Sequence, residues 1–136
     1  MKVVTVLDAS ALLAFLQGEP GQDMVLNALQ TQHCAMSAAN EAEVISKSLD
    51  RGLAPETIAA ILSELTYTAV DVTVADGQQA GNMRSFTRSV GLSLADRLCL
   101  ALAQRLKVRV LTADRVWLQV AEPLGLEVVL IRGGVH

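Results

Sequence analysis

Short apolar runs alternate along the chain with longer segments of helical periodicity. Each short run is apolar on both of its sides, as in a strand buried on both faces of a sheet, and the first run is also rich in β-branched residues. The runs predict strands over residues 2–7, 33–36, 69–74, 108–112 and 127–131. The segments between them predict helices over residues 11–17, 22–32, 38–50, 55–66, 75–90, 91–106 and 115–124. Strands that alternate with helices predict an α/β fold with a parallel sheet and right-handed crossovers.

The helix predicted over residues 91–106 has an almost entirely apolar body. Its leucines and alanines recur at helical spacing, so we expect this helix to lie in the middle of the domain. Asp96 and Arg97 nevertheless occupy its first turn. Residues 93–96 match the capping-box pattern, in which Ser93 caps the helix and Asp96 supports it. Asp96 is therefore either a structural cap or part of a site.

The helix predicted over residues 38–50 begins after Ser37, a favourable N-cap residue, and ends before Gly52. Its apolar positions predict a buried stripe of Ala38, Ala42, Ile45 and Leu49. A neighbouring polar stripe consists of Asn40, Glu43 and Lys47.

Composition narrows the class of protein. At 136 residues, 51% hydrophobic and with few aromatic residues, the chain is expected to form one domain with an Ala/Leu/Val core. The apolar runs are too short to span a membrane, and no signal peptide precedes the first strand. Cys34 and Cys99 lie in apolar surroundings and are interpreted as buried thiols of a reducing compartment, which predicts a cytoplasmic protein. A net charge of −3 argues against a broad basic surface for nucleic acid.

Four acidic residues are placed where a site is expected. Asp8 and Asp114 each follow a strand, and ligands of open parallel sheets bind outside the carboxyl ends of the strands. Asp96 opens a helix, and Glu43 can reach the same edge if its helix starts there. Each acid also has a structural interpretation: a turn at Asp8, a surface pair of Glu43 with Lys47, and helix caps at Asp96 and Asp114. Together, however, the four carboxylates would repel one another unless a cation neutralised them, and oxygen ligands without histidine suit Mg²⁺ or Mn²⁺.

Four segments resemble the sequence blocks of PIN-domain ribonucleases, and in particular the VapC toxins of bacterial toxin–antitoxin pairs. They occur in the family's order over nearly the whole chain, at residues 6–10, 36–43, 91–97 and 111–114. The resemblance implies a PIN-like three-layer fold, with a central five-stranded parallel sheet and about seven helices. It implies a single PIN domain over residues 1–132, and we expect residues 133–136 to form a frayed tail.

The same resemblance implies an endoribonuclease that hydrolyses RNA phosphodiesters with metal-activated water. It implies a homodimer, a VapB-type antitoxin as inhibitor, and Mg²⁺ or Mn²⁺ held by an acidic tetrad of Asp8, Glu43, Asp96 and Asp114. Glu41 competes with Glu43 for the family's glutamate, and Glu43 is preferred because residues 42–44 match the usual Ala-Glu-Val/Leu step.

Further residues match or flank these blocks. Four match polar neighbours that some family members use to orient ligands or water: Ser10, Asn40, Ser93 and Thr112. Arg97 and Arg115 are candidate RNA contacts, although both can equally be ordinary surface charges.

Two other functions remain open at this stage. One is a catalytically silent module with the same fold, which would act through protein partners docked on its Leu/Ala-rich helices. The other is a phosphohydrolase with Asp8 as nucleophile, which is disfavoured because no second acid stands two residues further on and no glycine-rich phosphate loop is present.

Overall fold

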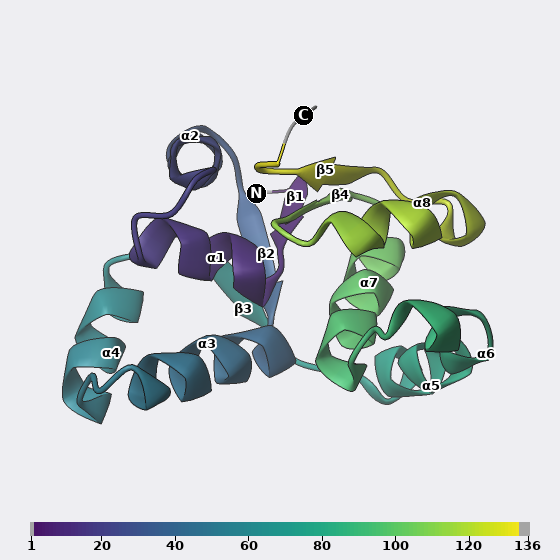
Figure 1. The fold of residues 1–136 in the computed structure, drawn as a ribbon, viewed down its shortest axis with the longest axis horizontal. Coiled ribbons are helices and arrows are strands. Elements are labelled where there is room, and N and C mark those ends of the chain that lie inside the picture. The colour runs from purple at the N-terminus through teal and green to yellow at the C-terminus, as the bar shows by residue number, and fades with distance from the viewer. Residues whose placement is uncertain (1, 134–136) are drawn as a thin grey trace.

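The computed structural model describes residues 2–133 and contains one fully parallel five-stranded sheet. The strands lie in the order β3-β2-β1-β4-β5 and comprise β1 (Thr5–Leu7), β2 (Cys34–Ser37), β3 (Thr68–Val70), β4 (Arg109–Thr112) and β5 (Val128–Leu130). The helices, visible in Figure 1, are α1 (Ala9–Leu16), α2 (Gln22–Thr31), α3 (Ala38–Asp50), α4 (Pro55–Ser63), α5 (Val74–Asn82), α6 (Arg84–Thr87), α7 (Leu94–Leu106) and α8 (Leu118–Leu124). Two 3-10 turns complete the fold, η1 (Arg88–Val90) and η2 (Arg115–Trp117). The predicted α/β class and parallel sheet are confirmed.

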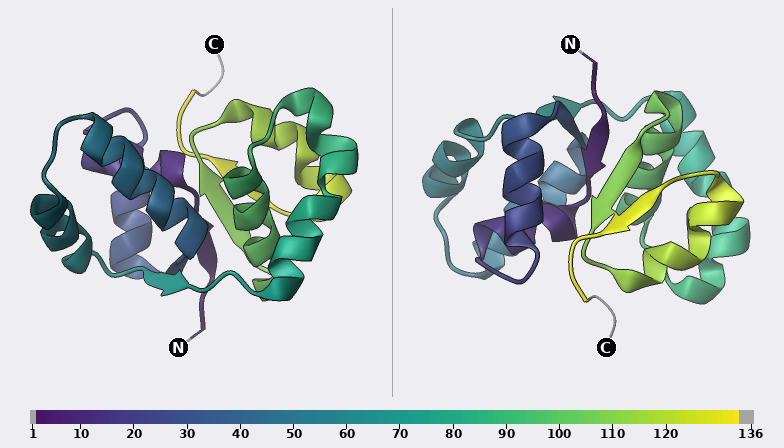
Figure 2. Two further views of the ribbon diagram at one scale, coloured as in Figure 1. Left: turned by 90° about the horizontal axis from the view of Figure 1, so that it is seen from below. Right: turned by 90° about the horizontal axis from the view of Figure 1, so that it is seen from above.

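Helices cover both faces of the sheet and form two hydrophobic cores (Figure 2). Val6 of β1 packs on one face with residues of α5, α7 and α8, whereas Leu7 packs on the other face with α1 and α2. In β4, Val110 and Leu111 divide between the two cores in the same way. Successive side chains of a strand point to opposite faces, so a strand covered on both sides must be apolar at every position.

The predicted elements agree with the structure within a few residues, with one helix divided. The helix expected over residues 75–90 is split into α5, α6 and η1, and Met83 joins α5 to α6. Gly77 and Gly81 lie in α5, and glycine lowers helix stability by about 1 kcal/mol relative to alanine. Of the predicted frayed tail, residues 134–136 lie outside the described residues.

The buried face of α3 is not the one predicted. Ala38, Ala42 and Leu49 are exposed, and the buried residues are Asn40, Val44 and Ser48. Of the predicted polar stripe, Asn40 is buried, Glu43 is half-buried and Lys47 is exposed. The hydrogen bonds of Asn40 bring the side of α3 that carries Asn40 and Glu43 against α7.

The α7 helix lies where its apolar body predicted. Residues 99–103 are all buried, although Leu94 at its start is 55% exposed. Lys107 ends the helix in a left-handed conformation. Among residues 2–133, no helix is long and apolar enough to cross a membrane.

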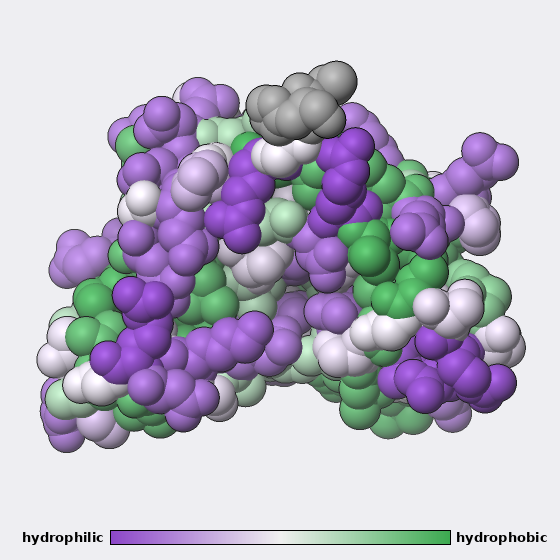
Figure 3. Space-filling model, viewed as in Figure 1, coloured by the Kyte–Doolittle hydropathy of each residue, from purple (hydrophilic) through white to green (hydrophobic). Residues whose placement is uncertain are grey.

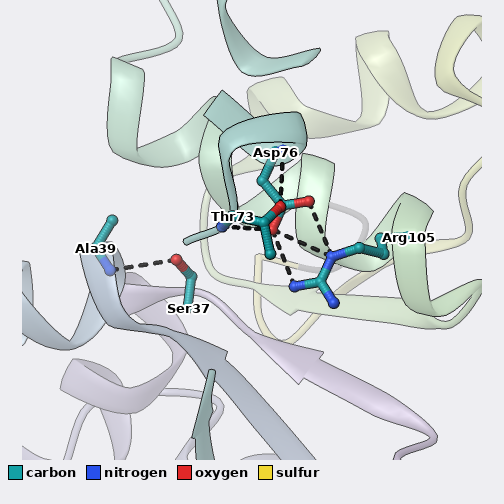
Figure 4. A network of polar contacts seen from close by, with 5 residues as sticks. All are labelled: Ser37, Ala39, Thr73, Asp76 and Arg105. Carbon is teal, nitrogen blue, oxygen red and sulfur yellow. Dashed lines mark hydrogen bonds and ion pairs between the residues drawn. The ribbon is translucent and has the colours of Figure 1, made fainter. Parts of the chain in front are cut away.

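An ion pair fixes α7 against α5 (Figure 4). The Arg105 guanidinium donates to both carboxylate oxygens of Asp76, with Nε–Oδ1 and Nη2–Oδ2 distances of 2.9 Å. Burial alone would raise the pKa of Asp76, but hydrogen bonds from Arg105 and Thr73 outweigh it and lower that pKa. In the same view, Ser37 caps α3 by accepting a hydrogen bond from the backbone N–H of Ala39. These contacts hold in place two helices whose N-termini border the site.

Candidate active site

Three helices begin where the central strands of the sheet end. Asp8 follows β1 and caps α1, Ser37 ends β2 and caps α3, and Ser93 caps α7. The N-termini of helices carry partial positive charge and therefore favour carboxylates and phosphates. Figure 3 shows hydrophilic residues around a recess in the middle of this face.

Asp8 lies at the bottom of this region and is only 2% exposed. Its carboxylate accepts hydrogen bonds from the Ser10 hydroxyl at 2.8 Å, from the Thr112 hydroxyl at 2.6 Å and from the Ala11 backbone N–H at 2.8 Å. The predicted supporting residues Ser10 and Thr112 thus both orient Asp8. These contacts come from α1 and β4, so the position of the carboxylate is set by two separate elements.

The pKa of Asp8 is raised from 3.8 to about 7. Burial is the main cause, and the negative charge of Asp96 adds to it, whereas the hydrogen bonds from Thr112, Ala11 and Ser10 oppose it. A nearby cation stabilises the ionised form of such a buried carboxylate more than it stabilises that of an exposed carboxylate.

Asp96 is both a cap and a neighbour of Asp8. The Ser93 backbone N–H donates to the Asp96 carboxylate at 3.0 Å, and the Asp96 backbone N–H donates to the Ser93 hydroxyl at 3.1 Å. The predicted capping box is therefore present. One turn further along α7, burial raises the pKa of the Cys99 thiol, and the negative charges of Asp8, Asp96 and Glu43 raise it further. Three of the four predicted acids thus lie around the same buried thiol.

Asn40 connects Glu43 to α7. Its side chain is completely buried, and its Nδ2 donates to Glu43 Oε1 at 3.1 Å and to the Ala95 carbonyl at 3.2 Å. Both partners are acceptors, so the amide nitrogen must face them and the amide oxygen must face away. This contact turns Glu43 toward the helix that carries Asp96.

Glu41, the competing glutamate, is engaged elsewhere. Its carboxylate accepts a hydrogen bond from the Tyr67 hydroxyl, at the end of the α4–β3 connection. Burial raises the pKa of Tyr67, and the hydrogen bond with Glu41 raises it further. This arrangement supports the choice of Glu43.

Asp114 lies at the exposed edge of the site. Its carboxylate accepts from the Val116 backbone N–H at 3.1 Å and caps η2, and its own N–H donates to the Thr112 hydroxyl at 3.0 Å. Thr112 therefore contacts both Asp8 and Asp114. Asp114 is thus connected to Asp8 through the Thr112 hydroxyl, but its carboxylate is not in contact with the other three acids.

The donor set fits a hard divalent cation in chemistry but is not assembled into a cage. Within residues 2–133, no three His, Cys, Asp or Glu side chains are close enough to hold one ion. Asp96 and Asp114 both accept backbone hydrogen bonds, so they would have to rotate to become ligands. The acids supply only oxygen donors, as Mg²⁺ and Mn²⁺ prefer, and the buried Oδ1 of Asn40 has no hydrogen-bond partner. The residues are thus suited to such an ion in chemistry, and their side chains would have to move to surround it.

The two predicted RNA-contacting arginines differ. Arg97 is buried, and its guanidinium donates to the Ala80 and Ser93 carbonyls, so it connects α7 to α5 and is turned away from the surface. Arg115 is exposed beside Asp114 and donates to the Gly133 carbonyl. Sequence reasoning did not anticipate the inward turn of Arg97, because a charged residue in an exposed first turn normally faces solvent.

The link between Asn40 and Glu43 predicts a measurable coupling in stability. We expect Asn40→Ala and Glu43→Gln each to change the free energy of unfolding, and the double variant to differ from their sum by about 1 kcal/mol, because only one hydrogen bond is shared. Urea denaturation of the four proteins in the cycle measures this coupling. Additive effects would show that the contact contributes nothing.

Comparison with known proteins agrees with this architecture. The family model of the PIN domain matches residues 5–123. A toxin–antitoxin complex from Klebsiella pneumoniae has a similar chain, with a TM-score of 0.71 and 19% identity over 94% of this chain and 98% of that one. DNA-bound VapBC from Salmonella typhimurium gives a TM-score of 0.72 and 15% identity, over 96% and 99% of the two chains.

A third structure, the toxin VapC20 of Mycobacterium tuberculosis, which cleaves the sarcin–ricin loop, gives a TM-score of 0.65 and 14% identity. It covers 81% of this chain and 88% of its own. No curated protein matches the sequence significantly. At these identities the solved structures establish a common fold, and the family model covers most of the chain. The chain belongs to the PIN-domain family.

Proposed function

We propose that the protein is a metal-dependent endoribonuclease and the toxin of a toxin–antitoxin pair. The observation that carries the proposal is the buried carboxylate of Asp8 at the carboxyl end of β1, with Asp96 and Glu43 near enough for their charges to act on the same site. Asp8 is buried with a pKa of about 7, and its charge is coupled to that of Asp96. Glu43 acts with both on the same thiol. A structural scaffold has no need of several buried or half-buried carboxylates in one place, because their mutual repulsion destabilises it.

The chain's own residues have distinct roles in this proposal. Asp8 is the fixed ligand, because three hydrogen bonds set its position before any ion binds. Glu43, held by Asn40 on α3, would position either an ion or a water molecule. Asp96 and Asp114 would release their backbone hydrogen bonds to hold the ion. Bound there, Mg²⁺ or Mn²⁺ would supply positive charge against the phosphoryl oxygens and lower the pKa of an attacking water.

RNA is the proposed substrate because a fold neighbour, VapC20 of M. tuberculosis, is an RNA-cleaving toxin. The protein partners are proposed on similar grounds, since VapBC complexes are among the fold neighbours. We propose a VapB-type antitoxin and a homodimer. A groove of about 450 Å³ between α1, α3 and α4 suits a partner helix. It is lined mainly by apolar residues, Leu16, Leu53, Ile58, Ile61 and Leu62, and also by Gln17, Ser48 and Arg51.

A matched pair of variants tests the activity. The purified chain is incubated with RNA and Mg²⁺ or Mn²⁺, with EDTA as the metal-free control. We expect cleavage by the wild-type chain and by Glu41→Gln, and loss of cleavage in Glu43→Gln and in EDTA. The two variants make the same chemical change at positions two residues apart on α3, which point to opposite sides of the helix, so a difference between them reports position.

Other outcomes have clear meanings. Equal activity of both variants would contradict the tetrad assignment. Absence of cleavage together with absence of Mn²⁺ binding would favour the catalytically silent binding module. If cleavage is found, mapping of RNA ends after brief expression without an antitoxin would identify the target RNA.

A further inference from the structure

The region around the four acids continues into a neighbouring pocket. A second pocket of about 320 Å³ opens beside Ser10, between α1, the second half of α3 and the chain that follows β5. Its charged residues are Glu19, Lys47, Asp50, Arg51 and Arg132.

Ser10 joins this pocket to the active site. Its hydroxyl donates to the Asp8 carboxylate at 2.8 Å and accepts from the Ala113 backbone N–H at 2.9 Å, and the same residue lines the pocket. On α3, Lys47 follows Glu43 by four residues and so lies on the same side, about 6 Å further along the helix axis. The pocket therefore borders the site of Asp8 through Ser10.

The charge of the pocket differs from that of the acidic site. Arg132 pairs with Glu19 at 3.3 Å, so its charge is partly neutralised and its position is fixed at the edge of the pocket. Among the residues that the structure describes, Lys47 and Arg51 have no carboxylate within 4.0 Å. The structural interpretation of Glu43 required an ion pair with Lys47, and this pair is not formed. Lys47 and Arg51 thus line the pocket without an ion-pair partner, together with one further acid, Asp50.

We propose that this pocket binds the phosphodiester next to the scissile one in a single RNA strand, with Lys47 and Arg51 as its cationic contacts. The inference rests on the proposed ribonuclease function. No aromatic side chain borders the pocket, so it has no surface on which a base could stack. It therefore positions the backbone and contributes nothing to the choice of sequence, which is the usual division between phosphate and base contacts.

The salt dependence of RNA binding tests this assignment without relying on cleavage. The full-length chain is titrated with a fluorescent 2′-O-methyl RNA oligonucleotide in Mg²⁺ at several KCl concentrations, and a gel verifies that the oligonucleotide stays intact. Each phosphate contact of a single strand contributes roughly 0.7 to the slope of log affinity against log salt. We expect Lys47→Gln to reduce the slope by about 0.7 and Lys47→Gln/Arg51→Gln by about twice that amount. Oligouridine and oligoadenosine should give the same reductions.

Lys2→Gln is the matched control, because it removes the same charge from an exposed residue at the opposite edge of the sheet, before β1. Its slope should equal that of the wild-type chain. Equal slopes for Lys47→Gln and Lys2→Gln, or no binding of RNA by the wild-type chain, would overturn the proposed pocket. If the slopes of Lys47→Gln and Lys2→Gln differ but no RNA is cleaved in the metal assay, the pocket is supported as a contact with the RNA backbone and the nuclease function is contradicted. If RNA is cleaved but the two slopes are equal, the nuclease function is supported and the pocket is contradicted.

Discussion

Replacing Asp8 with asparagine is expected to abolish RNA cleavage and, at the same time, to stabilise the metal-free protein. The first effect follows from the loss of the one acid whose position is fixed in advance. Loss of an outer-shell partner of a metal ligand already lowers activity roughly 10–100-fold, so the loss of a ligand should lower it further. The second effect follows from burial. At pH 8 the wild-type chain folds with an ionised carboxylate that is 2% exposed and has a pKa near 7, whereas asparagine carries no charge.

The expected gain is large for a single substitution. The pKa of Asp8 differs by about three pH units from its ordinary value, and each unit corresponds to 1.36 kcal/mol, so the free energy of unfolding at pH 8 should rise by up to about 4 kcal/mol. Urea denaturation in EDTA measures it. Asp71→Asn, at an exposed position, is the control and should leave stability within about 0.5 kcal/mol of the wild-type value. A less stable Asp8→Asn protein would contradict the assignment of Asp8 as a strained functional residue.

Much of the architecture could be predicted because strands buried on both faces must be apolar at every position. Val6 and Leu7 enter different cores, and the sequence pattern indicated as much. The edge at which Asp8 and Asp114 lie followed from the same reasoning, since parallel strands end on one side. The helix that carries Asp96 was predictable from its apolar body and its capping box.

The face of α3 could not be predicted, and the reason is physical. Small polar residues can be buried where hydrogen bonds compensate, and the Asn40 amide nitrogen donates to two acceptors. Asn40 and Ser48 therefore occupy the buried face that hydropathy assigned to Ala42 and Leu49. The partners that decide this lie far away in sequence: Ala95 for Asn40, and Tyr67 for Glu41. No local pattern contains these contacts, and the burial of Arg97 against the Ala80 carbonyl is a further example.

The stability of the metal-free wild-type chain should fall as the pH rises from about 5 to about 8. In the unfolded chain Asp8 ionises near its ordinary pKa of 3.8, whereas in the folded chain it holds its proton up to a pKa of about 7. Between these values the folded state binds more protons, so raising the pH favours unfolding, and the loss levels off above pH 7. About 2.7 kcal/mol should be lost between pH 5 and pH 8, because about two of the three pH units that separate the two pKa values lie above pH 5.

Asp76 and Cys99 do not contribute to the change in this window. The pKa of Asp76 is lowered from 3.8, so its stabilising effect is fully present from about pH 5 upward and is lost only at lower pH, and the pKa of Cys99 is raised above 9. Asp8→Asn should therefore flatten the profile. A divalent cation that binds the ionised acids competes with the proton for them. Mg²⁺ or Mn²⁺ should therefore stabilise the chain more at pH 8 than at pH 5. At 100 times its dissociation constant, the ion should stabilise the chain by about 2.7 kcal/mol. Urea denaturation at each pH, with and without the ion, measures both effects. A stability profile that is flat in EDTA would mean that Asp8 does not hold a proton at pH 5. Equal stabilisation by the ion at both pH values would mean that Asp8 does not exchange a proton for a metal.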